Sequence, residues 1–515
     1  MANRSADALF QLVKSLEKSE KRNFKLFVKR NSSADDLKTI QLFDALEKMT
    51  DYDEKQLLKK TKSITKQQLS NIKAQLYKQV LASLRLIRDE SNIDIQLHEQ
   101  MDHTRILFNK GLYLQALKML DKLKEQAKSY HQLTYLQQVL FFEKKIEALY
   151  ITRSMQNRAD QLSLESDSIN QQLSTVNKLS NLSLQLYSWY IQNGHARNQK
   201  DVATIRSYFE SNLPEGTHGL KGFYEKLYLY QSYCWYAFIR QDFLQYYRYS
   251  QKWVDIFDEH PGMLQTETAI YIKGMHNLMG AYFDLLNHQK LSEAIKKFER
   301  FAASRIVQQN ENNRILTYQY LYTARINLYF LQGTFTKGLR LVPFLEKMLK
   351  EYGPYLDTHR VLVFYYKIAC LYFGSGDNEK AIDYLNRIIN YKADLRTDLQ
   401  CYARLLHLIA HYELGNFDLL EYLIKSVYRY MAKMENLSKV EEEMFAFLRR
   451  SFHVGAHALK PEFEKLLNKL KKYEGNALES RAFVYLDVIS WLESKISGVN
   501  VQDVIREKFL SGRRK

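Results

Sequence analysis

The sequence contains very little glycine and proline. Its 515 residues include 18 glycines and 5 prolines, far below the average usage of the two residues that punctuate sheets and tight turns. A β-sandwich, barrel or propeller of this length would need dozens of turns, so these fold classes are excluded. Because 46% of the residues are apolar, the chain can build large cores, which excludes wholesale disorder.

Cysteine is also scarce, and long apolar runs are missing. Cys234, Cys370 and Cys401 lie far apart with no C-x-x-C pair, which argues against a disulfide framework or a thiolate zinc site and fits a reducing compartment. Residues 1–7 lack the apolar segment of a signal peptide, and no run of 18 apolar residues occurs, so no membrane span is expected. We therefore expect a cytoplasmic protein.

Apolar residues recur every three or four positions along nearly the whole chain, as at Leu76, Val80 and Leu84. This is the period of an amphipathic helix rather than of a strand. The breaks between such segments are short and polar, and helices joined by brief turns pack as antiparallel neighbours. The sequence therefore predicts an all-α fold.

Several segments repeat one pattern, in which a turn between two helices carries a glycine or polar residue and then a small residue. Good copies surround Gly111 and Gly376, and looser copies surround Gly333 and Gly415. Aligning the small-residue position gives Ala294, Gly338, Ala381 and Leu420, at intervals of 44, 43 and 39 residues.

This pattern resembles the tetratricopeptide repeat, in which a glycine closes the first helix and a small residue lets the second helix approach closely. The turn needs a residue that tolerates positive φ, and crossing helices need a contact without bulk. The spacing exceeds the family's 34 residues, Leu420 replaces the small residue, and the proline that ends each repeat is missing. The resemblance implies a right-handed α-solenoid of helical hairpins.

Residues 1–90 differ from the repeats. Residues 9–27 indicate two helices with Ser19 as N-cap, and a long helix is expected over about 65–88. This opening resembles that of a family of large helical proteins of Bacteroidota, a resemblance that implies no function. The sequence thus predicts a basic N-terminal helical region over residues 1–90 and a tetratricopeptide-like solenoid over residues 91–515.

Positive charge is concentrated near the N-terminus. The formal net charge is +17, and residues 1–88 hold 19 Lys and Arg against 10 Asp and Glu. Two interpretations stay open, a contact with RNA, DNA or an acidic protein and a solvated helix surface. The candidate basic surface consists of Lys14, Lys18, Lys21, Arg22, Lys25, Lys29 and Arg30.

Aromatic residues are concentrated over residues 223–257, which hold fourteen of them with Lys and Arg among them. Such residues can stack bases or anchor a peptide, but their helical spacing also fits packing between helices. First helices line the concave surface in the tetratricopeptide family. By that resemblance, the candidate partner-binding groove is a stripe on one first helix, made of Tyr318, Tyr322, Arg325 and Tyr329.

Motifs for catalysis or metal binding are weak. The pairs His407/His411 and His453/His457 have the i, i+4 spacing of zinc ligands, but neither contains the H-E-x-x-H glutamate. The simpler interpretation is surface or interhelix histidines. Residues 374–377 fit the turn of a repeat better than a phosphate loop. We therefore expect no enzyme activity, no metal and no cofactor.

These observations together predict a non-enzymatic cytoplasmic scaffold that binds a protein or peptide partner in the concave surface of the solenoid. The alternative is an RNA- or ribosome-associated protein that binds through the basic N-terminal region. Salt distinguishes the two, because binding dominated by phosphate contacts weakens steeply as salt rises. The sequence does not indicate an oligomeric state.

Overall fold

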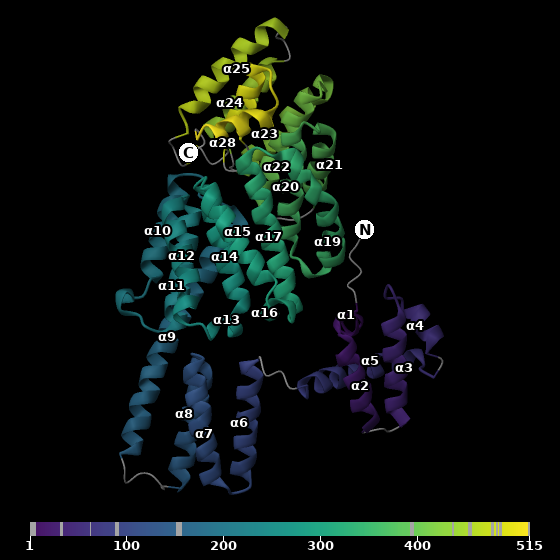
Figure 1. The fold of residues 1–515 in the computed structure, drawn as a ribbon, viewed down its shortest axis with the longest axis vertical. Helices are drawn as coiled ribbons and strands as arrows, with labels where there is room; N and C mark the ends of the chain where they lie inside the picture. The colour runs from purple at the N-terminus through teal and green to yellow at the C-terminus, as the bar shows by residue number, and fades with distance from the viewer. Residues whose placement is uncertain are drawn as a thin grey trace. The chain divides into compact units, whose positions relative to one another are not determined.

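The computed structural model describes residues 7–30, 34–61, 63–87, 92–150, 157–391, 396–434, 437–451, 456–474, 478–479, 483 and 487–512. The fold is 84% helix, with no strand in these ranges (Figure 1), which confirms the predicted all-α class. No helix in the part of the chain that is described is long and apolar enough to cross a membrane.

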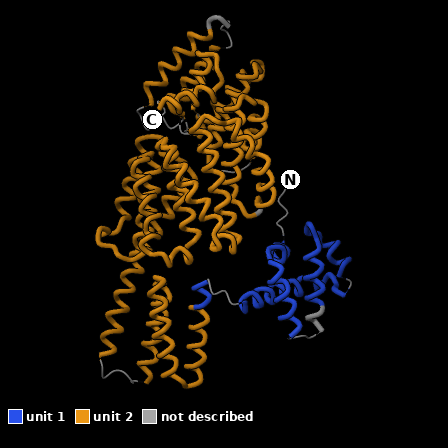
Figure 2. The backbone as a smooth tube through the Cα atoms, viewed as in Figure 1, with its two compact units in different colours: residues 1–96 blue, residues 97–515 orange. Residues whose placement is uncertain are grey.

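The chain folds as two compact units, residues 1–96 and residues 97–515 (Figure 2). The division predicted after residue 90 falls within residues 88–91, which lie outside the described residues, and it stays a prediction.

The first unit is a small helical bundle. Its helices are α1 (Ala8–Ser15), α2 (Lys18–Arg30), α3 (Ala34–Lys48), α4 (Glu54–Lys60) and α5 (Lys66–Arg85). Phe24 of α2 packs on Phe43 of α3 with ring centroids 4.6 Å apart, and both side chains are fully buried. The predicted N-cap Ser19 lies inside α2, because the helix begins one residue earlier and the Glu20 carboxylate accepts the amide of Glu17 at 2.7 Å.

The second unit is built of successive helices joined by short turns. The first of them are α6 (Ile93–Asn109), which spans the unit boundary, α7 (Tyr113–Ser129), α8 (Leu133–Tyr150), α9 (Arg158–Asn193), α10 (Gln199–Asn212), α11 (Phe223–Ile239), α12 (Phe243–Glu259), α13 (Met263–Thr266), α14 (Thr268–Asp284), α15 (His288–Ala302) and α16 (Arg305–Gln308). The remaining ones are α17 (Glu311–Gln332), α18 (Phe335–Gly338), α19 (Val342–Tyr352), α20 (Thr358–Ser375), α21 (Asn378–Ile389), α22 (Thr397–Glu413), α23 (Phe417–Lys433), α24 (Lys439–Ser451), α25 (Ala456–Lys471), α27 (Val488–Ser497) and α28 (Val501–Leu510).

These helices form hairpins that each contact the next. Helix α11 packs on α9 and α12, α14 packs on α12, α15 and α17, and α20 packs on α17, α18, α21 and α22 (Figure 1). The small residues that the sequence pattern singled out lie where helices approach. A Cβ at Gly338 would lie 2.6 Å from the Leu371 side chain, and Ala381 is fully buried.

Glycine closes several of the first helices in the left-handed region. Gly333 ends α17 with φ +61° and Gly376 ends α20 with φ +91°. The two sites differ in their surroundings. A Cβ at Gly376 would meet open space, whereas a Cβ at Gly333 would overlap the backbone amide of Arg506 and lie 2.8 Å from the Gln502 carbonyl oxygen in α28.

This difference predicts that Gly333→Ala will release α28 from the end of α17, whereas Gly376→Ala will not. Both changes cost about 1 kcal/mol through left-handed strain, and only the first also clashes with backbone. Hydrogen exchange over residues 501–510 measures the release. Equal protection of α28 in the two variants would contradict the prediction.

Candidate functional site

A cavity of about 270 Å³ lies inside the second unit, among α9, α11, α14, α17 and α20. Each helix contributes one face to its wall. On α14 the lining residues recur at the three- and four-residue spacing of a single helical stripe; they are Lys273, His276, Asn277, Gly280, Phe283 and Asp284. The cavity is therefore a consequence of how the first helices of consecutive hairpins lie side by side.

Two lysines of this wall are surrounded by aromatic rings rather than by carboxylates. The Lys273 ammonium lies 4.1 Å from the ring centroid of Tyr187 and 5.3 Å from that of Trp235. Among the described residues, Lys273 has no hydrogen-bond acceptor and no ion-pair partner. Cation–π contacts of this kind contribute roughly 0.5–2 kcal/mol, less than a buried ammonium loses in hydration.

Lys367 of α20 is held similarly. Its ammonium donates to Asn327 Oδ1 at 2.5 Å and lies 5.5 Å from the ring centroid of Phe330 and 5.7 Å from that of Phe283. No carboxylate of the described chain lies within ion-pairing distance of it. Burial lowers the pKa of both Lys273 and Lys367 to about 8, because an ammonium removed from water is disfavoured. At neutral pH most of these amines are still charged.

Two arginines of the wall do have carboxylate partners. Arg396 and Asp398 form a buried bidentate pair with N–O distances of 2.7 and 2.8 Å. Arg360 pairs with Asp357 at 2.7 Å, and Asp357 also caps α20 by accepting the Arg360 amide at 2.9 Å. The cations of the cavity without an ion pair among the described residues are therefore the two lysines, of which Lys367 lies within electrostatic range of Asp284.

The remaining titratable groups of the cavity are mostly neutral. Burial, together with nearby cations, lowers the pKa of His276 and of His359 to about 3. Burial raises the pKa of Asp284 to about 7, although the Lys367 charge opposes this rise. Asp284 is thus the one acidic group of the wall that changes its charge near neutral pH.

Asp284→Asn is expected to change how stability depends on pH. Because the folded-state pKa is raised, protonation of Asp284 stabilises the fold fully below about pH 4, and this contribution is lost as pH rises through 7. Asparagine keeps the neutral form, so the variant should gain about 1–3 kcal/mol over the wild type between pH 4 and pH 8. Urea denaturation across this range measures the gain, with the exposed Asp418→Asn as control. Parallel pH profiles for wild type and Asp284→Asn would contradict the expectation.

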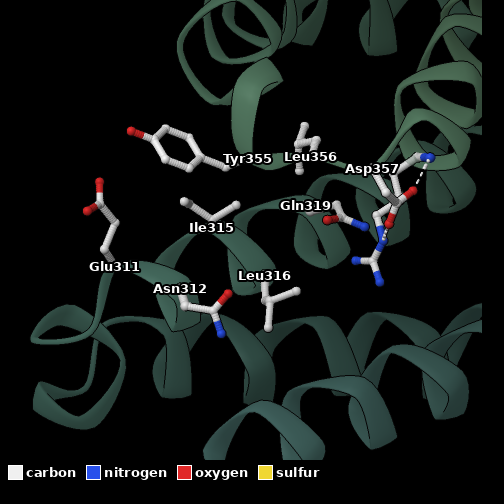
Figure 3. A pocket seen from close by; sticks show the side chains of 9 residues that line it. Glu311, Asn312, Ile315, Leu316, Gln319, Tyr355, Leu356 and Asp357 are labelled. Carbon is white, nitrogen blue, oxygen red and sulfur yellow. Dashed lines mark hydrogen bonds and ion pairs between the residues drawn. The ribbon is translucent and has the colours of Figure 1, made fainter. Parts of the chain in front are cut away.

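A second pocket of about 410 Å³, which we call the outer pocket, adjoins the cavity. It lies between α17 and the segment before α20, where Tyr355 and Leu356 face Ile315 and Leu316 (Figure 3). Gln319 and Arg360 line both spaces. Tyr355, which is half exposed, lies with Glu311 at the end of the pocket away from Gln319 (Figure 3). The outer pocket therefore reaches the surface at Tyr355 and borders the cavity at Gln319 and Arg360.

The predicted groove residues lie on a different face of α17 from the cavity. Tyr318 and Tyr322 pack on Phe344, and Arg325 pairs with Glu299 at 2.6 Å while stacking on Tyr322. Tyr329 contributes to the core shared with the following hairpins. The cavity uses the neighbouring stripe, with Gln319, Tyr320, Thr323, Asn327 and Phe330. The role of the predicted stripe as a groove stays a prediction.

The predicted basic surface is partly engaged within the first unit. Lys14 donates to the Glu47 carbonyl oxygen at 2.7 Å, Lys21 pairs with Glu47 at 3.5 Å, and Lys25 pairs with Asp44 at 2.8 Å. Its other members, Lys18, Arg22, Lys29 and Arg30, make no ion pair within the described residues. The binding role of this surface stays a prediction.

The histidine pair of α22 is a packing feature. His407 and His411 are buried and lie 3.3 Å apart between their Nε2 atoms. Burial lowers the pKa of His407 to about 4. Over the described ranges, no group of three or more His, Cys, Asp and Glu could hold a metal ion. Of the other pair, His453 lies outside the described residues, as does the side chain of His457.

The aromatic segment 223–257 serves both packing and the cavity. Phe223, Trp253 and Phe257 are buried in the core, whereas Trp235, Phe238 and Tyr246 line the cavity. Sequence reasoning missed the charged lining residues. A usable signal was present, because Lys273 and Lys367 interrupt strongly apolar and aromatic helices at positions where such helices bury their side chains.

Comparison of the chain with protein-family models, with curated proteins and with solved structures gives no match.

Proposed function

We propose that this chain is a non-enzymatic cytoplasmic scaffold that binds a protein or peptide partner on the inner face of a right-handed α-solenoid of tetratricopeptide-like hairpins. Successive hairpins that contact one another, left-handed glycines at the turns and small residues at the helix contacts support this architecture. A solenoid buries a continuous core between neighbours and leaves an extended concave surface for a partner.

The observation that carries the proposal is the pair of uncompensated lysines in the cavity. A buried ammonium without a carboxylate costs stability, and such costs are concentrated at functional sites. A partner that brings acceptors to Lys273 and Lys367 would offset the cost on binding. The outer pocket offers it a path, since it shares Gln319 and Arg360 with the cavity.

A photo-crosslinking experiment tests this assignment. A p-benzoylphenylalanine at position 355 replaces an exposed tyrosine at the mouth of the outer pocket and should crosslink to the partner in cell lysate. The same group at position 422, another exposed tyrosine on α23, is the matched control. A crosslink that forms at 355 and not at 422, and that survives nuclease, is the expected result. Equal products at both positions, or none at 355, would count against the proposal.

A second candidate function is binding of RNA or a ribosome through the first unit. The observation that favours it is a surface hollow of about 370 Å³ on α2, lined mainly by cations that include Lys18, Arg22 and Lys29. These three make no ion pair among the described residues. Partners lost on nuclease treatment, or released steeply between 50 and 200 mM salt, would favour this function.

A further inference from the structure

Several residues that line the cavity have hydrogen-bond donors without a partner in the described chain. Nη1 of Arg360 and Nδ2 of Asn277 are buried, and neither has a hydrogen-bond partner of acceptable geometry in the described chain. Among the described residues, the ammonium of Lys273 has no acceptor and that of Lys367 has one, Asn327. Acceptors without a hydrogen bond in the described chain include Oε1 of Gln319 and the carboxyl of Asp284. A ligand that fits this wall must bring acceptors.

Positive charge converges on one part of the cavity. His276 lies within electrostatic range of Lys273, Lys367 and Arg360 at once. It stacks on Tyr320 with ring centroids 4.0 Å apart, so it is fixed in place between the helices. A negative group near His276 would therefore be attracted by Lys273 and Lys367, and by Arg360 to the extent that its pair with Asp357 leaves charge over. These surroundings make charge interactions stronger than in water.

Apolar surface surrounds the same charges. The rings of Tyr187 and Trp235 flank Lys273, and those of Phe283 and Phe330 flank Lys367. A small inorganic anion would leave these rings without a contact. An anion carried on an apolar body would use both the rings and the donors, which is the usual composition of a small-ligand site.

Asp284 limits how much negative charge a ligand in the cavity can carry. Its carboxyl lies in the same wall and within electrostatic range of Lys367. Near neutral pH Asp284 is partly ionised, so it would repel a dianion more strongly than a monoanion. The Asp284 carboxyl and the aromatic wall thus favour a monoanion with an apolar body over phosphate.

We propose that this cavity binds a carboxylate attached to an apolar body, with the carboxylate oxygens accepting hydrogen bonds from Lys273, Lys367, Arg360 and Asn277. The inference rests on the proposed function in one respect, because the carboxylate can belong to an acidic residue of the partner. A free carboxylic acid of the same chemistry is the other source.

Calorimetric titration of the full chain at pH 7 with 3-phenylpropionate tests the ligand class. The acid is expected to bind, and its uncharged amide is expected to bind at least ~10-fold more weakly, because charge-assisted hydrogen bonds are roughly twice as strong as neutral ones. Inorganic phosphate is expected to bind more weakly than the acid. The comparison of acid with amide needs no variant, so it holds even where a substitution disturbs folding.

Substitutions of the two lysines test whether 3-phenylpropionate binds in the cavity. Lys273→Met and Lys367→Met should each weaken binding of the acid at least ~10-fold. Lys425→Met, which removes an exposed cation of α23 that pairs with Glu421 and does not line the cavity, should leave this binding unchanged. No binding of the acid to the wild type, equal binding of acid and amide, or full binding by both lysine variants would overturn the inference and leave a cavity filled by water.

Competition between 3-phenylpropionate and the partner, measured by the crosslink at position 355, identifies the source of the carboxylate. Loss of the partner crosslink in the presence of 3-phenylpropionate would assign the carboxylate to the partner. A crosslink that persists while the acid binds supports a free carboxylic acid as ligand. Binding of the acid with no crosslinked partner supports the inference and refutes the proposed function. A crosslinked partner without any binding of the acid refutes the inference alone.

Discussion

Asp398→Ala is expected to destabilise the second unit by about 3–5 kcal/mol, the cost of removing one partner of a buried ion pair. The side chains of Arg396 and Asp398 are only 4% and 2% exposed. Without the Asp398 carboxylate, the Arg396 guanidinium stays buried, stacked over the ring of Tyr190 at 5.3 Å.

The pair also joins two distant parts of the chain. The Arg396 amide donates to the Ile191 carbonyl oxygen at the end of α9, and a Cβ at Gly194 would lie 2.6 Å from the Asp398 carboxylate. Because α9 and Arg396 both line the cavity, Asp398→Ala should loosen one of its walls as well as lower stability.

Tryptophan fluorescence during urea denaturation measures this effect in the second unit alone, since all four tryptophans, at positions 189, 235, 253 and 491, lie within residues 97–515. Glu210→Ala is the matched control. It removes an i, i+4 ion pair whose side chains are about 60% exposed, and such pairs contribute roughly 0–1 kcal/mol. Equal midpoints for the two variants would show that the buried pair does not hold the fold.

The helical class and the turn chemistry could be predicted from sequence because both are local. Period and composition decide helix against strand over windows of a dozen residues. Gly376 and its neighbours have the composition of a helix-ending turn, and the left-handed φ of this glycine agrees with that prediction.

The cavity could not be predicted in the same way, because it depends on how each helix is rotated about its axis. Helix α17 is aromatic on more than one face, so the sequence alone does not say whether Tyr318 or Tyr320 points inward. In the structure Tyr320 lines the cavity and Tyr318 packs on Phe344. The meeting of the two lysines could not be predicted either. Lys273 and Lys367 lie 94 positions apart and come together only through the packing of α14, α17 and α20.

The N-terminal lysines illustrate the same limit. A stripe of cations on α2 can be recognised in the sequence, but the ion pairs that two of its lysines, Lys21 and Lys25, form with α3 cannot. Lys25 contacts both Asp44 and Glu47, which are about twenty positions away. Whether a basic stripe is available to a partner therefore depends on tertiary contacts that composition does not encode.

The double variant Lys273→Met/Lys367→Met is expected to lose the partner while gaining stability. The folded-state pKa of each lysine is lowered to about 8, so the charged form costs stability in full below pH 8 and this cost disappears as pH rises toward the unfolded value. Methionine removes it. The variant should therefore be more stable than the wild type at pH 7 by about 2–4 kcal/mol, and the difference should shrink toward pH 10.

Partner binding should change in the opposite direction. In the double variant, a partner that places acceptors in this cavity loses two charge-assisted hydrogen bonds, which are worth about 1.5–3 kcal/mol each. The affinity of the protein for the partner should therefore fall at least ~100-fold. A gain in stability together with a loss of binding is the behaviour of residues kept for function. Substitution of residues that serve packing alone would lower both stability and binding.

The most direct test of the central claim is the yield of the position-355 crosslink in the wild-type background and in the Lys273→Met/Lys367→Met background. Tryptophan fluorescence would first establish that the second unit of the variant is folded. The proposed binding site predicts a nuclease-resistant partner crosslinked by the wild type and almost none by the folded variant. An equal yield from the two proteins would contradict it, because the partner would then bind without the charges of the cavity.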